Sequence, residues 1–444
     1  MSHSTEKVLS NKQSRPAIVV VGGGFAGTKL VKTLEKLIPK TWDIFLLSED
    51  NYVTFNPLLP EVIGADLLPA HVLAPIRLMI NRTRVRMVRV DRIDVKEKCI
   101  YYHGNEPGTV YYDHLVMAAG VRANVDMLPG MSQFGLPLKT VGDALYIRNR
   151  IITQLESATI QPNQEERKRL VTFLVVGGGF SGVEVAGELC DFIIAAERYF
   201  KNVKADECKV IVVHGEDRLL PELSEPLGKK VFEIFNRRGI EVHLNKWVKE
   251  INKNSVLLDC GRVIEAGTII CTLGTKPSAF FNDTELPTER GKVIAQQDMS
   301  VKGEEGVWAI GDCALITNTY NQQHCPPTAQ FAEQQAVQLA KNIQSSILGK
   351  PTQPFYYKPK GMLASIGHNK AVAEIYGIRI SGFIAWLMWR AIYLLKMPTF
   401  SRKVRLFLEW SWAMFFPPDI SHLGFQRSKD FEKNSDTKKP EDTL

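Results

Sequence analysis

Two glycine-rich segments carry the clearest chemical signal in the sequence. The segment 171–188 begins as an apolar, β-branched run, turns through Gly177, Gly179 and Gly182, and continues as a helix-forming run. This spacing is typical of a loop that binds a dinucleotide: the first glycine permits a tight turn, the second lets the backbone approach a pyrophosphate, and the third lets the helix pack against the strand. The N-terminus of such a helix attracts phosphate charge.

The same spacing occurs once more, near the start of the chain. Gly22, Gly24 and Gly27 lie between another apolar segment and another helix-forming segment. One such loop is weak evidence, because glycine-rich turns are common in α/β proteins. Two copies predict two nucleotide sites in one polypeptide, one for a flavin and one for a nicotinamide nucleotide. The alternative is a single doubly wound domain that contains two tight turns.

Other small and acidic residues follow the predicted strands. Glu49 follows the strand after the first loop and is the candidate acid for the adenosine ribose of the flavin nucleotide, the alternative being a charged turn. Gly120 closes a small-residue turn that lets backbone lie against a cofactor. Gly311 and Asp312 end a later strand, where the carboxylate can accept hydrogen bonds from a ribityl hydroxyl.

A predicted helix over 326–348 carries a pair of amides near its start. Gln330 and Gln334 are four residues apart and share one face of the helix. A plain amphipathic helix explains the apolar residues of this segment but not the two glutamines. A helix N-terminus aimed at a flavin would also stabilise a negatively charged ring.

Length and pattern together predict the architecture. A chain of 444 residues with 45% hydrophobic residues suggests two or three folded domains. We expect an α/β fold with two Rossmann-like dinucleotide-binding domains, the flavin domain split by the nicotinamide domain, and a helix over 65–80. The expected parts are 16–145 and 286–365 for the flavin domain, 146–285 for the nicotinamide domain, 366–424 for a C-terminal docking region and 425–444 for a disordered tail.

The net charge of +7 suits either a nucleic acid or an anionic membrane as a partner. The position of the basic residues along the chain indicates which of the two to expect. The arginines over 82–92 alternate with apolar residues, which predicts a strand face rather than a nucleic-acid patch. Four tryptophans coincide with basic residues over 379–416, which favours amphipathic helices at an anionic membrane surface. The alternative is that this region packs against the chain itself or against a second copy in a homodimer. Its longest apolar run is interrupted by Arg390 and is too short to span a bilayer.

The seven cysteines are scattered and form neither a CxxC motif nor a cluster with metal-ligand spacing. The sequence therefore predicts reduced thiols and no metal site.

With these motifs, the chain resembles the type II NADH:quinone oxidoreductases over about 16–424. The most specific match is AQFAEQ at 329–334, which fits the family's quinone-site pattern of Ala-Gln-any-Ala-any-Gln. FNPLLPEV at 55–62 is similar to the family's stretch beside the flavin. The runs WRAIYLL and FFPPD are similar to its membrane-docking helices.

The resemblance implies FAD on the first glycine loop and on Asp312, and a nicotinamide nucleotide on the second loop. It implies that Glu184 contacts the ribose on the nicotinamide side. Ala329 and Gln330 would lie beside the flavin, Gln330 and Gln334 would face the quinone headgroup, and Trp389 would form a wall of the quinone tunnel. The resemblance therefore implies three catalytic residues, which are Glu184, Gln330 and Gln334.

The implied activity is oxidation of NADH with two-electron reduction of a membrane quinone, without proton pumping. The implied location is peripheral, on the cytoplasmic face of a bacterial inner membrane or on an equivalent energy-transducing membrane. A sulfide:quinone oxidoreductase is the alternative in the same fold, but it needs cysteine before the second loop, and no cysteine lies between Cys99 and Cys190. A flavoprotein that binds NAD(P)H only as a redox sensor is another alternative.

The choice of nucleotide departs from the common pattern. The strand after the second loop usually ends in an acid that binds the adenosine ribose and repels the extra phosphate of NADPH. Here His214 takes that position and the nearest carboxylate is Glu216. We therefore expect NADH as the main donor, with appreciable use of NADPH, especially below neutral pH.

Overall fold

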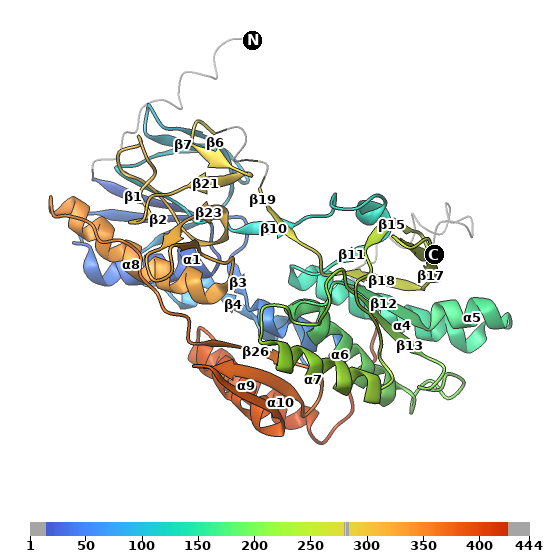
Figure 1. The fold of residues 1–444 in the computed structure, drawn as a ribbon. Helices are drawn as coiled ribbons and strands as arrows, with labels where there is room; N and C mark the ends of the chain where they lie inside the picture. Colours follow the sequence, from blue (N-terminus) through green and yellow to red (C-terminus); the bar gives the residue numbers. More distant parts are fainter. Residues whose placement is uncertain (1–14, 279, 281–283, 425–444) are drawn as a thin grey trace, which may run out of the picture.

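The structure, a computed structural model, describes residues 15–278, 280 and 284–424 (Figure 1). It contains two parallel sheets, each flanked by helices, and a smaller C-terminal unit of antiparallel strands and two helices. This arrangement confirms the expected α/β fold with two dinucleotide-binding units. The tail expected over 425–444 lies outside the described residues.

The first parallel sheet is assembled from two distant parts of the chain. Its strand order is β22-β9-β1-β2-β5, and all neighbours are parallel. The strands are β1 (Ala17–Val21), β2 (Asp43–Ser48), β5 (Arg84–Met87), β9 (His114–Met117) and β22 (Val307–Ala309). Since β22 returns to this sheet after the whole second sheet has formed, the second unit is inserted into the first.

Two helices from opposite ends of the first unit cover one face of this sheet. Helix α1 (Phe25–Leu37) follows the first glycine loop, and α8 (Ala329–Ile347) packs beside it (Figure 1). Thr328 caps α8 by accepting a hydrogen bond from the Phe331 N–H. The buried face of α8 includes Phe331, Ala332, Gln335 and Ala336.

The second parallel sheet has the strand order β11-β18-β12-β13-β14. Its strands are β11 (Leu136–Pro137), β12 (Thr172–Val176), β13 (Lys209–Val213), β14 (Glu241–His243) and β18 (Thr268–Cys271). The helices of this unit are α4 (Val141–Ile160), α5 (Gln164–Leu170), α6 (Phe180–Ala196) and α7 (Glu225–Arg237). A capping box between Thr140 and Asp143 starts α4 and satisfies backbone groups that the first turn leaves open.

A short two-stranded ribbon joins the two units. Strand β10 (Val121–Ala123) pairs antiparallel with β19 (Thr275–Pro277), so the chain crosses between the units twice at one place (Figure 1). The ribbon lies against the cavity described below.

The remaining elements form smaller sheets and short helices. The antiparallel sheets comprise β6 (Arg89–Asp94) with β7 (Cys99–His103) and β8 (Pro107–Tyr111), and β15 (Val248–Asn252) with β16 (Ser255–Leu258) and β17 (Val263–Glu265). Short strands are β20 (Thr288–Glu289), β21 (Lys292–Ile294), β23 (Ala314–Leu315), β24 (Thr317–Asn318) and β25 (Gln323–His324), and short helices are α2 (Leu59–Ile63) and α3 (Met131–Phe134).

The expected helix over 65–80 is wrong. The chain there forms a single 3-10 turn at Pro69–Val72, the strand β4 (Leu73–Pro75) and another 3-10 turn at Ile76–Leu78, and β4 pairs with β3 (Tyr52–Thr54). Pro69 and Pro75 explain the difference, because each lacks the N–H that a continuous helix requires.

The C-terminal unit packs below both parallel sheets in Figure 1. Its antiparallel sheet contains β26 (Gly361–Ser365), β27 (Ala371–Ile375) and β28 (Ile378–Gly382), and α9 (Phe383–Lys396) and α10 (Phe400–Ala413) follow. Within the described part of the chain, no helix has both the length and the hydropathy needed to cross a bilayer.

The tryptophans of this unit are mostly internal, contrary to the interfacial positions expected for all four. Trp386, Trp389 and Trp410 are buried, and only Trp412 is largely exposed. Arg390 is also buried, with its guanidinium over the rings of Trp386 and Trp410. The coincidence of tryptophan and charge in this sequence thus reflects a packed interior as well as a surface.

Candidate active site

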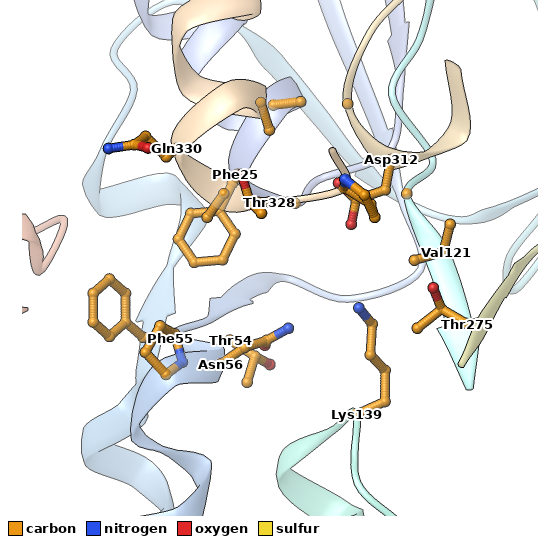
Figure 2. A pocket seen from close by; sticks show the side chains of 18 of the residues that line it. Phe25, Thr54, Phe55, Asn56, Val121, Lys139, Thr275, Asp312, Thr328 and Gln330 are labelled. Carbon is orange, nitrogen blue, oxygen red and sulfur yellow. The ribbon is translucent and has the colours of Figure 1, made fainter. Parts of the chain in front are cut away.

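A single cavity of about 1980 Å³ lies between the two parallel sheets and reaches the C-terminal unit. Its walls come from the ends of β1 and β2, the starts of α6 and α8, the ribbon of β10 and β19, and the end of α9. Figure 2 shows the central part, with Phe25 and Phe55 facing each other on one side. This volume is larger than an ordinary small-molecule pocket, which suits more than one ligand.

The first glycine loop is shaped for a close approach of a ligand to its backbone. Gly22 has φ +110°, and a Cβ there would lie 2.3 Å from the Ala118 carbonyl oxygen. A Cβ at Gly27 would lie 1.9 Å from the Gly22 carbonyl oxygen, so this position holds helix α1 against the turn. Gly24 has nothing within 4 Å and lines the cavity. The first and third glycines therefore serve packing, and the second leaves room for a phosphate.

The second loop repeats this geometry. Gly177 has φ +112°, and a Cβ there would lie 2.7 Å from Thr272 Oγ1. A Cβ at Gly182 would lie 1.9 Å from the Gly177 carbonyl oxygen. Gly179 has more space, with Glu222 Oε1 as its nearest neighbour at 3.4 Å. The three glycines do not line the cavity themselves; the loop borders it through the first turn of α6, at Phe180, Ser181 and Glu184.

Asp312 and Lys139 enter the centre of the cavity from opposite sides (Figure 2). Burial raises the pKa of Asp312, and the positive charges of Lys139 and Lys292 oppose this rise. The preceding Gly311 N–H donates a hydrogen bond of 2.8 Å to Gln335 Oε1, which fixes the turn. Lys139 and Gln335 were missed in the sequence, because neither belongs to a recognisable motif.

Two further residues expected at the flavin also line the cavity. Gly120 follows β9 and leaves open space on its cavity side. Glu49 follows β2, and both of its carboxylate oxygens accept hydrogen bonds from Arg122 Nη2, at 2.8 and 2.9 Å. A ribose that binds to Glu49 would share the carboxylate with this arginine.

The two glutamines expected at the quinone do not occupy equivalent positions. Ala329 and Gln330 line the cavity at the start of α8. Gln334 is exposed and does not line it. Its neighbour Gln335 is buried instead, because position 335 lies on the face of α8 that packs against α1.

Glu184 forms part of the cavity wall although it is only 6% exposed. Burial raises the pKa of Glu184 to about 8, while a hydrogen bond from the Ser365 N–H, 3.2 Å long, acts in the opposite direction. The carboxyl is therefore mostly protonated at neutral pH. Trp389 is buried behind Tyr393, with the two rings edge to face at 4.8 Å, and Tyr393 rather than Trp389 lines the cavity.

His214, the position expected to influence the choice between NADH and NADPH, is hydrogen-bonded to the second loop. His214 Nδ1 accepts a hydrogen bond of 3.1 Å from the Gly178 N–H of the second loop. Burial lowers the pKa of His214, since the charged form is poorly solvated. The imidazole is thus neutral around neutral pH, which argues against the expected gain of NADPH use just below neutrality. Glu216 is exposed and lies outside the cavity lining.

These residues fit FAD at the first loop. The open position at Gly24 has room for a pyrophosphate, Glu49 directly follows the second strand, and the half-buried Asp312 lines the cavity with Lys139 and Lys292 as its charged neighbours. Cys271 is the only cysteine among the described residues of the lining, and none of the seven cysteines forms a disulfide.

Comparison with known proteins agrees with this geometry. Residues 16–336 match the family model described as pyridine nucleotide-disulphide oxidoreductase, and residues 360–418 match the NDH2 C-terminal domain. A probable NADH dehydrogenase of Dictyostelium discoideum is 30% identical over 440 residues, covering 94% of this chain and 95% of that protein. The type II NADH:quinone oxidoreductase NdhA of Mycobacterium tuberculosis is 29% identical over 419 residues, covering 89% and 86%.

Solved structures show the same fold. NDH2 from Plasmodium falciparum, in complex with NADH, superposes with a TM-score of 0.85 at 21% identity and covers 92% of this chain and all of that one. The sulfide:quinone oxidoreductase of Aquifex aeolicus superposes with a TM-score of 0.69 at 17% identity, covering 93% and 100%. The chain belongs to the pyridine nucleotide-disulphide oxidoreductase family and, by its C-terminal domain and its relatives, to the type II NADH dehydrogenases within it.

Proposed function

We propose that this protein oxidises NADH and reduces a quinone by two electrons, with FAD as its cofactor and without pumping protons. The observation that carries the proposal is the single cavity, which joins the first glycine loop, the start of α6 after the second loop, and the end of α9. A nicotinamide and a quinone can both reach a flavin there without leaving the protein. Bound FAD supplies the redox chemistry, because it accepts a hydride and passes on two electrons.

The residues of the chain bind and orient the reactants. The backbone at Gly24 and the N-terminus of α1 hold the pyrophosphate of FAD, and Asp312 accepts hydrogen bonds from the ribityl chain. Phe180, Ser181 and Glu184 hold the nicotinamide side of NADH at the start of α6. The second loop holds the pyrophosphate of NADH, with its open position at Gly179.

The quinone end of the cavity is assigned to α8 and α9. Gln330 provides an amide donor for a quinone oxygen, and Gln334 lies one turn further along α8. Tyr393 and Lys396 of α9 line the cavity and connect it to the C-terminal unit. Trp389 supports Tyr393 from behind, so its role is to hold the wall rather than to contact the quinone.

The C-terminal helices form the membrane-docking surface of this proposal. Several large apolar side chains on these helices and directly after α10 are exposed, and exposed apolar side chains that gather in one region mark an interaction site. They are Phe383, Ile384, Leu387, Leu395, Phe400, Phe407, Leu408, Trp412, Phe415 and Phe416. Arg402, Lys403 and Arg405 lie on the same helix as Phe400 and Phe407, which suits an anionic lipid surface.

The same reasoning assigns the parts of the chain. Residues 16–145 and 286–365 would bind FAD, 146–285 would bind NADH, and 366–424 would dock on the membrane. The side of the membrane follows from the location of NADH, so we assign the protein to the cytoplasmic face of an inner membrane or its equivalent. A homodimer stays a prediction, which sedimentation in detergent would test.

Neither alternative activity is favoured by the cavity. A sulfide oxidoreductase holds sulfur on reactive thiolates, whereas Cys271 is deeply buried and burial raises its pKa to about 12. A redox sensor needs only one bound nucleotide, which leaves the connection of the cavity to α9 unexplained.

The direct test is purification in detergent, followed by a flavin spectrum and NADH oxidation with and without a quinone. We expect a bound flavin and NADH oxidation that depends on added quinone. Steady turnover with quinone excludes a role limited to sensing, and absence of turnover with quinone would contradict the proposal.

A further inference from the structure

A large aromatic side chain is exposed near the second glycine loop, outside the cavity. Trp247 is 61% exposed, whereas tryptophan is highly buried on average. It follows β14, which pairs in parallel with β13, as β13 does with β12. The carboxyl ends of these three strands therefore share one edge of the sheet. Nucleotides bind at this edge of a parallel sheet, so the indole is placed to meet one.

The indole rests with one face on the backbone of Gly215. A Cβ at Gly215 would lie 2.6 Å from Cδ2 and Cε2 of Trp247 and 2.7 Å from its Cζ2. Cδ2 and Cε2 form the bond that the two rings of the indole share, and an atom can reach that bond only from above or below the ring plane. Gly215 thus covers one face of the ring, and only glycine leaves room for this contact.

Backbone hydrogen bonds fix the segment that carries Trp247. The Asn245 N–H donates to the Glu216 carbonyl at 2.9 Å, which ties the segment after β14 to the one after β13. The Trp247 carbonyl accepts a hydrogen bond of 2.8 Å from the Asp259 N–H. Because the platform is already ordered, a ligand that stacks on the ring loses little affinity to ordering of the protein.

The contacts from the second loop to Trp247 follow the direction in which a dinucleotide lies. The Gly178 N–H of the loop donates to His214 Nδ1 at 3.1 Å. The His214 carbonyl in turn accepts a hydrogen bond of 3.0 Å from the N–H of Lys246, the residue before Trp247. In dinucleotide-binding units the pyrophosphate lies at the glycine loop and the adenosine ribose at the end of the next strand. Trp247 lies one step further out, on the side of β14.

We propose that Trp247 binds the adenine ring of NADH by stacking on its exposed face. The inference rests on the proposed function, because it concerns the electron donor named there. Every nucleobase has a π face, and stacking on an aromatic side chain contributes substantially to its binding. Glu216, which directly follows Gly215, is exposed and offers a carboxylate to the ribose beside the base.

The platform determines which reduced nicotinamide is a good donor. The adenine lies at the opposite end of the dinucleotide from the nicotinamide, so Trp247 touches no reacting atom. It binds the ground state and the transition state equally, and this kind of binding lowers KM and leaves kcat unchanged. The protein therefore prefers a dinucleotide to a mononucleotide that carries the same nicotinamide.

The test compares two electron donors in the full-length protein with its flavin. Ferricyanide is the acceptor, so neither a quinone nor a membrane enters the measurement. NADH carries the adenosine, and reduced nicotinamide mononucleotide carries the same hydride donor without it. For Trp247→Ala we expect the KM for NADH to rise about tenfold with kcat unchanged. The KM for the reduced mononucleotide should stay within about twofold.

Binding of ADP-ribose measures the same contact without any electron transfer. ADP-ribose has the adenosine and the pyrophosphate of NADH but lacks the nicotinamide. Its Kd, measured by calorimetry, should rise about tenfold in Trp247→Ala, in parallel with the KM for NADH. Trp247→Phe keeps an aromatic face and should retain most of the affinity.

A variant at the supporting glycine tests the platform without removing the indole. Gly215→Ala places a methyl group where the ring lies, so the ring has to move and the affinity for ADP-ribose should fall. The matched control is Tyr146→Ala on α4 of the same unit, at an aromatic residue that is 63% exposed. Helix α4 packs on α2 and α5, so this variant should leave both donors and ADP-ribose unaffected. Flavin content and melting temperature report on folding in every variant.

The outcomes separate this inference from the proposed function. Equal rises in KM for both donors in Trp247→Ala, or an unchanged Kd for ADP-ribose, would overturn the role of Trp247. A platform that instead meets a second copy of the chain would give that unchanged Kd. Failure of the unmodified protein to oxidise NADH would overturn the proposed function, and binding of ADP-ribose would still test the stacking.

Discussion

At the scale of single residues, sequence spacing was most reliable where backbone geometry leaves few choices. Both glycine loops have the geometry that their spacing predicts, because a Cβ at Gly22, Gly27, Gly177 or Gly182 would meet its neighbours at 2.8 Å or less. The side chains that line the cavity were harder to predict. Lys139 and Tyr393 reach the cavity through packing of distant elements, and no local pattern marks them.

The glutamine at the start of α8 gives the first prediction. Gln330→Ala should slow flavin reoxidation by quinone roughly tenfold, which corresponds to the loss of one hydrogen bond of about 1.4 kcal/mol. Flavin reduction by NADH should change little, because Gln330 lies on the quinone side. Gln334→Ala serves as the comparison and should have the smaller effect, since Gln334 is exposed outside the cavity lining. Equal losses in both half-reactions would contradict the assignment of Gln330.

The second prediction concerns His214. Its pKa is lowered by burial, and its Nδ1 is engaged with the Gly178 N–H, so no positive charge develops there around neutral pH. The ratio of kcat/KM for NADH to that for NADPH should therefore stay constant from about pH 6.5 to about pH 8.

His214→Glu should increase this ratio, because a carboxylate repels the extra phosphate of NADPH. Glu216→Gln is the comparison, and we expect a smaller effect because Glu216 lies outside the cavity lining. A ratio in the unmodified protein that falls as the pH drops through 6.5 would show that the imidazole becomes charged.

At the scale of elements, periodicity identified the long helices and failed where proline interrupts them. Helix α8 occurs at Ala329–Ile347, inside the segment 326–348 where the sequence predicts it. The segment 65–80 has apolar residues at helical spacing, but Pro69 and Pro75 turn it into short pieces. On α9 and α10 the sequence showed two amphipathic faces without showing which one packs inward.

The exposed face of α10 gives the third prediction. Replacing Phe400 and Phe407 on α10, and Phe415 directly after it, together with Ser should weaken binding to anionic vesicles by more than tenfold, since each phenylalanine that enters the lipid contributes about 1.5–3 kcal/mol. The control is Ile160→Ser, at an equally exposed apolar residue on α4, which should leave binding unchanged. Co-sedimentation with vesicles measures both, and unchanged binding of the triple variant would place the dock elsewhere.

Charge reversal on the same helix gives the fourth prediction. Arg402, Lys403 and Arg405 changed to Glu should weaken vesicle binding most at low salt, where lipid charge is least screened. The difference from the unmodified protein should shrink as salt is added. A loss that does not depend on salt would indicate damage to the helix rather than loss of attraction.

At the scale of the whole molecule, the sequence predicted two nucleotide units but not the interior between them. The return of the chain to the first sheet follows from Gly311 and Asp312, which look like a strand end of the flavin unit. Helix α2 packs against α6 and is hydrogen-bonded to α10, although these helices are far apart along the chain. Trp410 and Glu61, for example, are joined by a hydrogen bond but are 349 residues apart.

The buried carboxyl groups give the fifth prediction, which concerns stability. The folded pKa of Glu61 is about 7 and its ordinary value is 4.5, so the folded protein keeps a proton that the unfolded chain loses. The stability that protonated Glu61 contributes to the folded protein is fully present below about pH 4.5. It is therefore lost as the pH rises through about 7. Glu61→Gln should remove a few kcal/mol of this pH dependence.

Melting curves across pH test this expectation. Glu35→Gln is the control with the opposite sign, because hydrogen bonds lower the pKa of Glu35 against the effect of burial. The stability that ionised Glu35 contributes to the folded protein is present above the ordinary pKa of a glutamate, and it is lost as the pH falls. A melting temperature of Glu61→Gln that follows the same pH curve as the unmodified protein would show that Glu61 does not hold a proton in the folded state.

The central claim is that one cavity passes electrons from NADH to a quinone through bound flavin. Anaerobic stopped-flow spectroscopy of the purified protein tests it most directly, by mixing first with NADH and then with a quinone. We expect the flavin absorbance to be lost with NADH and to return with quinone, each step at a rate that supports the steady turnover. Loss of absorbance with NADH without recovery on adding quinone would contradict the claim.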